Sequence, residues 1–414
     1  MSRRNQKKGN NKKANEDDDL EFLMAAAAHN REQKEMEKKS HIIPDSVFVD
    51  LPQAPCKTYE NREFPHRDFL EYNEHAGFRP KDKEQAKRLE EIEAALPDLR
   101  EGGLIHEQVR DWALQHDIIR PGVKLFDMCA QIEEAVRRQV QFHPPDRGLA
   151  FPCGCSLNNT AAHYTPISAA DETVLGTSDV MKIDFGVSIN GHIIDSAFTV
   201  CFDDRFKPLI EASREATNKA IRMAGPDVRI CEISNTIDEI ISSYQIELNN
   251  KIIPLKPVRN LTGHQMAYYK VHSGKFIPIS KAPPGQEYNE RMEIGELYAL
   301  ETFATTGDGV VFDQGPPSHF MLTSHSNQIH VKNGSQKDLV DCIQRNFKTL
   351  AFCQRFLDKA EQTDYKLTLD QLVKLKAVDP YPPLCDIEGS YVSQHEHCFV
   401  ILEKGKEVVS RTHE

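Results

Sequence analysis

The sequence lacks the long apolar runs, the paired cysteines and the surplus of positive charge that mark several common classes of protein. No apolar stretch approaches the roughly 18 to 20 residues that a membrane helix needs, and the basic start is followed by Glu16–Asp19 in place of an apolar signal core. The ten cysteines form no CxxC pair, which argues against a disulfide framework or a thiolate zinc finger. A net charge of −12 excludes a bulk polyanion binder. We therefore expect a cytoplasmic protein that binds neither DNA nor membranes.

Composition divides the 414 residues into a tail, a lead-in and a folded domain. Residues 1–40 are highly charged, and the first fourteen carry six basic residues and no acid, so we expect a disordered tail. Such a tail is a solubilising segment or a contact to RNA on the ribosome. Residues 41–80 contain scattered prolines and are expected to form an extended lead-in. The folded domain would span residues 81–414, starting with a charged helical pattern from Lys81 to Ala95.

A diverged internal repeat runs through the folded domain. A turn and an amphipathic helix recur at an offset of 105 residues, the strand Asp179–Asp184 recurs at an offset of 117, and the strand Asp195–Val200 recurs at an offset of 201. These offsets predict two homologous α+β halves, with 84 extra residues between the last two strands of the second half. Much of the extra segment has a helical pattern, so we expect a helical insertion at about residues 322–385.

Two acids are expected on one face of a hairpin in the first half. The dipeptide Asn190-Gly191 between two β-rich runs predicts a two-residue type I′ turn. That turn places Gly186 opposite Asp195, so Asp184 lies diagonal to Asp195 on the same face. Buried like charges at this spacing need a cation or a shared proton between them. For an isolated hairpin, the alternative is two ordinary acids on a solvated face.

The repeat favours a metal site over that alternative. Asp184 corresponds to Glu301 and Asp195 to Glu396, so four carboxylates would meet between the halves. Two divalent ions would match their charge, and such oxygen donors admit Mn²⁺, Fe²⁺, Co²⁺ or Zn²⁺. His264 is the candidate imidazole ligand because the carboxylates need one, although a histidine after a glycine is more often a capping or surface residue.

Two such ions, about 3.5 to 4 Å apart, would hold a hydroxide that can attack a carbonyl or phosphoryl centre. The sequence contains no P-loop, GxGxxG or GxSxG motif that would indicate a different chemistry. His163, His272 and His319 lie in polar contexts and are candidates to polarise a substrate.

Several short segments together match one known family. They are Phe151–Asn159, Ala162–Pro166, Lys182–Gly186, Ile194–Asp195, Gly263–His264, His272, Glu301–Phe303, Ser318–His319 and Glu396–His397. Through them, residues 85–414 resemble the type 2 methionine aminopeptidases. The resemblance implies the pita-bread fold, in which two pseudo-symmetric α+β halves surround a dinuclear metal site. It also implies that the insertion is the helical, winged-helix-like one of the type 2 class.

The resemblance further implies a role for individual residues. Asp195 and Glu396 would bridge two metal ions, Glu301 would also act as the acid and base, His163 would serve the scissile amide and the leaving amine, and His272 would steady the substrate and the intermediate. The five implied metal ligands are Asp184, Asp195, His264, Glu301 and Glu396. The implied lining of the methionine pocket is Phe151, Gly263, Val271, His319 and Tyr381, beside His163 and His272.

By the same resemblance, the protein would remove the initiator methionine from nascent polypeptides whose second residue is small, during translation. We expect it to act as a monomer on nascent amino termini, with ribosome association through the basic tail as a candidate interaction. Two alternatives remain open from the sequence. One is an aminopeptidase P or prolidase, which has a similar fold and ligand set but cleaves before proline. The other is a non-catalytic growth-regulating or RNA-binding relative of the same fold.

Overall fold

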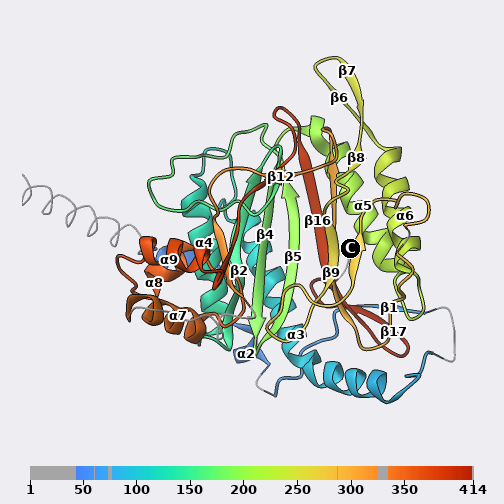
Figure 1. Cartoon of the computed structure of the whole chain (residues 1–414), viewed down its shortest axis with the longest axis horizontal. Helices are drawn as coiled ribbons and strands as arrows, with labels where there is room; N and C mark the ends of the chain where they lie inside the picture. Colours follow the sequence, from blue (N-terminus) through green and yellow to red (C-terminus); the bar gives the residue numbers. More distant parts are fainter. Residues whose placement is uncertain (1–42, 60, 73–76, 287, 324–333, 413–414) are drawn as a thin grey trace, which may run out of the picture. The chain divides into compact units, whose positions relative to one another are not determined.

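The computed structural model of the protein describes residues 43–59, 61–72, 77–286, 288–323 and 334–412 (Figure 1). The predicted tail, residues 1–40, lies outside these residues. The chain divides into two compact units, Met1–Val49 and Asp50–Glu414. In the first unit, the described part contains the short 3-10 helix η1 (Asp45–Phe48). The remaining description concerns the second unit.

The first half of the second unit is an antiparallel sheet covered by two helices. Strands β2 (Arg147–Leu157), β4 (Met181–Ile189) and β5 (His192–Val200) lie side by side in this order. Helices α3 (Lys83–Gln115) and α4 (Leu125–Val140) pack on one face of this sheet. Because side chains alternate along a strand, the odd-numbered residues of β4 are buried toward the helices and the even-numbered ones face the other way.

The second half repeats this arrangement with a larger sheet. Its strands follow the order β1 (Asp68–Glu71), β17 (Gly405–Val408), β16 (Val392–Ile401), β11 (Leu297–Thr305), β9 (Thr262–Gln265) and β10 (Phe276–Pro278), and β8 (Lys256–Pro257) also pairs with β11. Helices α5 (Lys207–Met223) and α6 (Ile230–Ser243) cover it. In Figure 1 the two sheets lie side by side, with β5 next to β16. The structure thus confirms the two α+β halves that the repeat predicted.

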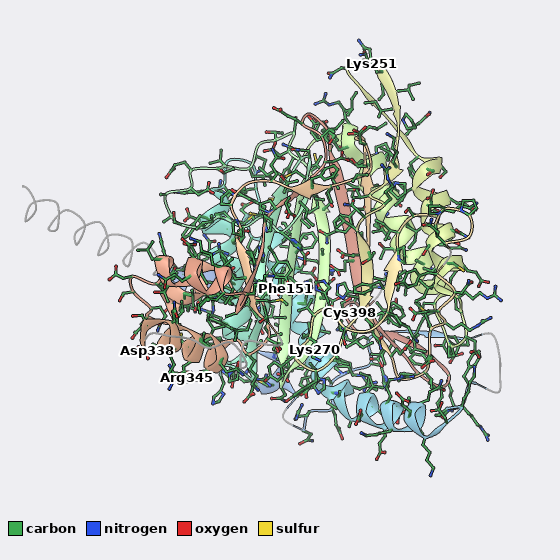
Figure 2. All side chains as sticks on the ribbon, viewed as in Figure 1. Phe151, Lys251, Lys270, Asp338, Arg345 and Cys398 are labelled. Atoms are coloured by element: carbon green, nitrogen blue, oxygen red, sulfur yellow. The ribbon has the colours of Figure 1, made fainter. Side chains whose placement is uncertain are left out.

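Smaller elements connect and decorate these halves. They are α2 (Pro55–Thr58), β3 (Thr160–Ala162), η2 (Asp204–Phe206), the hairpin of β6 (Gln245–Leu248) and β7 (Lys251–Pro254), β12 (Phe312–Asp313) and β15 (Leu384–Cys385). The hairpin of β6 and β7 projects at the top of Figure 1, and Lys251 marks its tip in Figure 2. None of the described helices is long and apolar enough to cross a membrane.

The predicted hairpin between β4 and β5 is confirmed. Asn190 and Gly191 have φ angles of +50° and +84°, as a type I′ turn requires at both central positions. The register pairs Gly186 with Asp195, which leaves Asp184 diagonal to Asp195. The turn chemistry of two residues therefore determines which side chains of this hairpin face each other.

The insertion lies where the repeat offsets place it. Strands β13 (His319–Leu322) and β14 (Val378–Tyr381) pair with each other and enclose helices α7 (Gly334–Asn346), α8 (Gln354–Lys359) and α9 (Lys366–Lys374). These helices bury apolar residues that include Leu339 and Leu372. In Figure 1 the insertion covers the edge of the first half beside α4 and β2.

The start of the domain differs from the sequence-based expectation. The helix expected from Lys81 to Ala95 runs as α3 from Lys83 to Gln115, continuing past Pro97 because the later residues, such as Leu99 and Ile105, are fully buried against the first-half sheet. The lead-in is only partly extended, because it contains the short helices η1 and α2; its strand β1 pairs with β17 and belongs to the second-half sheet. Tertiary packing, which local sequence patterns do not show, accounts for both differences.

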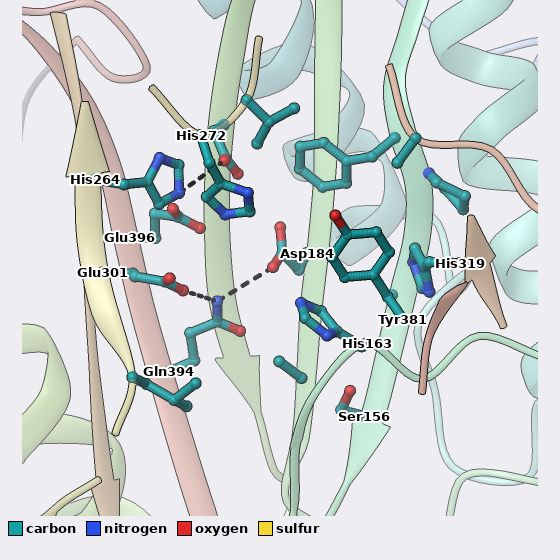
Figure 3. Close-up of a pocket in the computed structure, with 18 of the residues that line it drawn as sticks. Ser156, His163, Asp184, His264, His272, Glu301, His319, Tyr381, Gln394 and Glu396 are labelled. Carbon is teal, nitrogen blue, oxygen red and sulfur yellow. Dashed lines mark hydrogen bonds and ion pairs between the residues drawn. The ribbon is translucent and has the colours of Figure 1, made fainter. Parts of the chain in front are cut away.

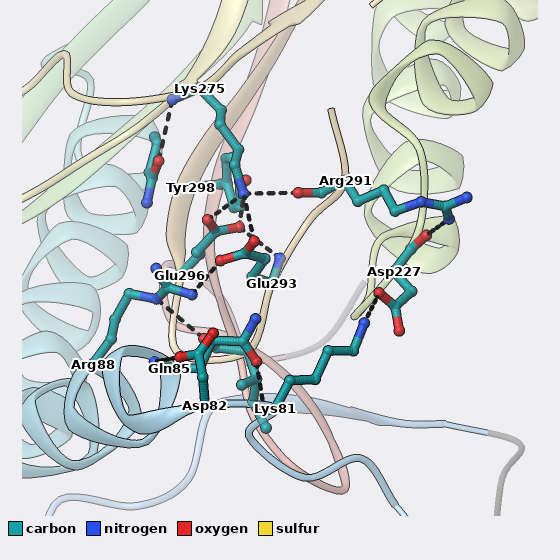
Figure 4. A network of polar contacts seen from close by, with 12 residues as sticks. Lys81, Asp82, Gln85, Arg88, Asp227, Lys275, Arg291, Glu293, Glu296 and Tyr298 are labelled. Carbon is teal, nitrogen blue, oxygen red and sulfur yellow. Dashed lines mark hydrogen bonds and ion pairs between the residues drawn. The ribbon is translucent and has the colours of Figure 1, made fainter. Parts of the chain in front are cut away.

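A polar network fixes α3 to the second half (Figure 4). Glu296, which is buried, accepts hydrogen bonds from Lys275 at 2.6 Å and from Tyr298 at 2.7 Å. Arg88 of α3 donates to Glu293 at 2.6 Å. The start of β11, four residues after Glu293, is therefore held against α3.

Candidate metal centre and substrate pocket

A cavity of about 820 Å³, counted with its open mouth, lies between the two halves and the insertion. It is lined by Phe151, Pro152, Gly154, Ser156, Ala162, His163, Asp184, Asp195, Leu261, His264, Val271, His272, Glu301, Phe303, His319, Met321, Ala351, Tyr381, Gln394 and Glu396. All the site residues predicted from the sequence are among them, with the exception of Gly263. That glycine lies next to His264 on β9, where a Cβ atom would come within 3.0 Å of the Ala299 carbonyl oxygen on β11.

The four acids converge from four central strands. Asp184 and Asp195 extend from β4 and β5 on the face opposite to the helices. Glu301 on β11 and Glu396 on β16 are paired directly opposite each other, whereas the two aspartates are diagonal. The repeat is therefore inexact: the second-half pair differs in register from the first-half pair, although both face the same cavity.

His264 lies beside two of these acids. Its Nε2 atom is 3.6 Å from Asp195 Oδ2, and one ligand atom from each of Asp195, His264 and Glu396 can be chosen so that all lie within 4.8 Å of one another. Figure 3 shows His264, Glu301 and Glu396 on one side of the cavity, with Asp184 across from them. The structure thus brings together all five residues that the sequence offered as ligands.

Asp195 and Glu396 are buried, Asp184 and Glu301 are half-buried, and the four acids lack matching positive charge. Among the described residues, no lysine or arginine forms an ion pair with any of the four, and Asp184 Oδ1, Glu396 Oε2 and His264 Nδ1 have no hydrogen-bond partner. Burial, followed by repulsion from Asp184, raises the pKa of Glu301 to about 8, and burial raises the pKa of Asp184 to about 7. Burial raises the pKa values of Asp195 and Glu396 as well. Unpartnered carboxylate oxygens around one imidazole are a donor set that fits hard or borderline divalent cations.

Gln394 belongs to this site although the sequence reasoning did not include it. Its Nε2 atom donates hydrogen bonds to Asp184 Oδ2 at 3.2 Å and to Glu301 Oε2 at 2.9 Å (Figure 3). Gln394 precedes Glu396 by two residues on β16, so both point to the same face of the strand. The two-residue spacing from Glu396 is a sequence signal from which Gln394 could have been identified. By bonding to Asp184 of the first half and Glu301 of the second, the Gln394 amide fixes the positions of these two carboxylates relative to each other.

Side chains join β5 to β16 across the boundary between the halves. Ser196 Oγ donates to the Glu396 carbonyl oxygen at 2.7 Å. The Asp195 amide donates to Cys398 Sγ at 3.0 Å, and the thiol donates back to the Asp195 carbonyl oxygen at 2.8 Å. These contacts fix the backbones of Asp195 and Glu396 relative to each other. The distance between the two carboxylates is therefore set largely by the backbone.

The other end of the cavity is apolar and aromatic. Phe151, Val271, His319 and Tyr381 line the cavity as expected. Four further lining residues were not included in the sequence reasoning: Leu261, Phe303, Met321 and Ala351. Met321 lies on β13 and Ala351 lies in the insertion between α7 and α8, and a single sequence gives no signal for either contact.

Two histidines of the cavity, the half-buried His163 and the buried His319, lie close to each other and to Tyr381. The His163 ring centroid lies 6.1 Å from that of His319 and 5.8 Å from that of Tyr381. Burial lowers the pKa of His163 to about 4 and that of His319 to about 3. Ser318 Oγ donates to the His163 carbonyl oxygen at 2.7 Å and lies 3.0 Å from His319 Nδ1, which links the two positions. Both imidazoles are therefore neutral at pH 7 and able to exchange hydrogen bonds with a neutral amide.

Known proteins resemble this chain in sequence and fold. The model of metallopeptidase family M24 matches residues 98–331. The chain is 39% identical to methionine aminopeptidase 2A of Arabidopsis thaliana over 365 residues, which are 88% of this chain and 81% of the relative. It is 40% identical to methionine aminopeptidase 2 of Komagataella phaffii over 384 residues, 92% of this chain and 82% of the relative.

Among solved structures, a thermophilic Arx1 has a TM-score of 0.65 at 17% identity, covering 77% of this chain and 91% of its own. Methionine aminopeptidase from Rickettsia prowazekii has a TM-score of 0.51 at 15% identity, covering 77% and 97%. At these identities the likeness concerns the fold alone, and it confirms the predicted pita-bread class.

Proposed function

The chain belongs to metallopeptidase family M24 and, within it, to the type 2 methionine aminopeptidases, and we propose how its cavity carries out their reaction. It is a methionyl aminopeptidase, a metal-dependent exopeptidase that removes the initiator methionine. The single observation that carries the mechanism is the convergence of four acids, two buried and two half-buried, and one buried imidazole, with no ion-paired basic side chain among the described residues to balance them.

We assign two divalent ions to these five residues. Asp195 and Glu396 would hold the ions together with Asp184, His264 and Glu301, because they come from adjacent strands of the two halves and their backbones are joined by the contacts of Ser196 and Cys398. Co²⁺, Mn²⁺, Fe²⁺ and Zn²⁺ all suit the donor set. When bound, the ions would supply Lewis acidity that polarises the methionyl carbonyl and makes water a better nucleophile.

The side chains of the cavity would position the peptide. The unbranched thioether would lie among Phe151, Val271 and Tyr381, an apolar slot suited to a flexible, polarizable side chain. His163, neutral at pH 7, would hydrogen bond the scissile amide and assist the departing amine. His272, at the mouth of the cavity, would hold the carbonyl side of the substrate. Glu301 would take a proton from the attacking water and return it to the amine.

The physiological substrates would be nascent polypeptides with a small second residue, met in the cytoplasm by a monomeric enzyme. All ten cysteines are unpaired, which suits a reducing compartment. The buried thiol of Cys129 lies close enough to hydrogen bond to the buried thiols of Cys153 and Cys155, without forming a disulfide.

Release of free methionine from the peptide Met-Ala-Ser tests this function. We expect release after loading with Mn²⁺ or Co²⁺, and little cleavage of Leu-Pro peptides. Glu301→Gln should abolish turnover, because the amide cannot accept the proton, while the fold is retained. Glu407→Gln is the control, because Glu407 is a buried acid of the same sheet that does not line the cavity. Preferential cleavage of Leu-Pro peptides would instead assign the chain to the prolidase type.

A further inference from the structure

The loop between β9 and β10 contributes Val271 and His272 to the cavity, and its turn is stabilised by contacts with other segments of the chain. Residues 266–275 form this loop, which contains Val271 and His272. At its tip, the backbones of Ala267 and Lys270 bond to each other at 3.0 and 2.9 Å, and Lys270 marks the turn in Figure 2. Tyr269 within the turn has a φ of +54°, a left-handed conformation that is unfavourable for a tyrosine. Contacts from other segments must therefore stabilise it.

Three separate segments supply those contacts. The Tyr269 amide donates to the Gly191 carbonyl oxygen at 2.9 Å, at the tip of the β4–β5 hairpin. The Tyr269 hydroxyl donates to Asp146 Oδ1 at 2.8 Å, in the loop before β2. Thr349 Oγ1, in the insertion, donates to the Tyr269 carbonyl oxygen, and Lys348 Nζ lies 3.9 Å from the ring centroid and 3.4 Å from Asp146. One tyrosine of the second half therefore contacts both the first half and the insertion.

Close packing at the hairpin tip supports the same contact. A Cβ atom at Gly191 would lie 2.3 Å from a ring carbon of Tyr269, so only glycine allows the ring to pack against the turn. Tyr269 is 5% exposed, whereas its neighbour Tyr268 is 60% exposed. The buried tyrosine is thus an anchor for the loop, and the exposed one is not.

We propose that Tyr269 is a positioning residue of the active site, held by Asp146, Lys348 and Thr349. It would fix the wall of the methionine pocket that Val271 and His272 form two and three residues further along the chain. The His272 ring packs edge-on against that of His264 at a centroid distance of 4.2 Å, so the loop lies directly beside a candidate metal ligand. The insertion contributes to substrate binding through Lys348 and Thr349 as well as through its own lining residues. This inference rests on the proposed aminopeptidase reaction.

A matched pair of tyrosine variants tests it. Tyr269→Phe removes the hydroxyl bonded to Asp146. Tyr365→Phe removes a hydroxyl bonded to Asp358 at the same distance, 2.8 Å, from a tyrosine that is 6% exposed and does not line the cavity. Both variants lose one buried hydrogen bond to an acid, so their thermal unfolding midpoints should fall by similar amounts. In Tyr269→Phe alone, we expect KM for Met-Ala-Ser to rise about threefold to tenfold, with a smaller change in kcat and unchanged bound metal.

A second measurement connects the effect to the insertion. Lys348→Met should also raise KM, and adding it to Tyr269→Phe should raise KM by less than the product of the single effects, because both side chains act through Asp146. Equal KM values for Tyr269→Phe and Tyr365→Phe, or fully multiplicative effects of Tyr269→Phe and Lys348→Met, would overturn the proposal. A parent enzyme that releases no methionine would instead contradict the proposed function, so the two failures are distinguishable.

Discussion

Gly186→Ala tests whether the methionine slot is as tightly packed as the structure shows. Gly186 lies on β4 in register with Phe151 of β2, a lining residue of the cavity. A Cβ atom at Gly186 would lie 2.3 Å from Phe151 Cε1, 2.7 Å from Phe151 Cδ1 and 2.8 Å from Ala150 Cβ. Carbon atoms pack at about 3.5 to 4.0 Å, so the ring must move by roughly 1 Å or more. Because it already lines the slot, the displaced ring would reduce the space for methionine.

The expected magnitudes follow from overpacking. Inserting one carbon into a packed core costs about 1 to 3 kcal/mol, and 1.4 kcal/mol corresponds to about a tenfold change in kcat/KM. We therefore expect Gly186→Ala to lose about 1 to 3 kcal/mol of unfolding free energy in urea and to lose about tenfold in kcat/KM for Met-Ala-Ser, chiefly through KM. Gly334→Ala is the control, because a Cβ atom there meets no atom within 4 Å. If Gly186→Ala keeps the parent KM while folding normally, the packing argument is refuted.

Three further predictions follow from the same structure. Ser196→Ala should weaken metal binding about 10- to 100-fold by isothermal titration, since second-layer contacts orient ligands, and an unchanged affinity would show that the contacts between β5 and β16 do not matter. Adding a chelator should lower the melting temperature of the holoenzyme, because the buried acids lose their counter-charge; no shift would argue against structural metal binding. Burial lowers the pKa of His106 to about 3 in the folded protein. As the pH falls below about 6.5, His106 is therefore protonated in the unfolded chain but not in the folded one, which favours unfolding. Urea stability should therefore decline from pH 6.5 toward 3, and less steeply in His106→Gln.

The hairpin acids and the repeat were predictable because they depend on local rules. Asn190 and Gly191 specify a two-residue turn, and that turn fixes the relation of Asp184 to Asp195. The correspondence between the halves then identified Glu301 without any contact information. Register within the second half was not predictable in the same way, because β11 and β16 are separated by the insertion and no short turn sets their pairing.

The residues that the sequence reasoning missed act through tertiary contacts. Ala351 and Met321 enter the cavity only because the insertion folds against the first half. Tyr269 has an ordinary sequence context, and its role depends on Asp146 and Lys348, which lie more than 75 residues away in either direction. Hydrophobic periodicity and residue spacing describe single helices and strands, so they do not predict contacts between segments that are distant in the sequence.

Simultaneous measurement of bound metal and methionine release tests the central claim most directly. Metal-depleted protein would be titrated with Mn²⁺ while bound metal per chain and turnover of Met-Ala-Ser are followed in the same samples. We predict that turnover appears as metal binds, that binding saturates at two ions per chain, and that Asp195→Asn lowers both. Full turnover in metal-free protein, or saturated binding with no methionine released, would contradict the account.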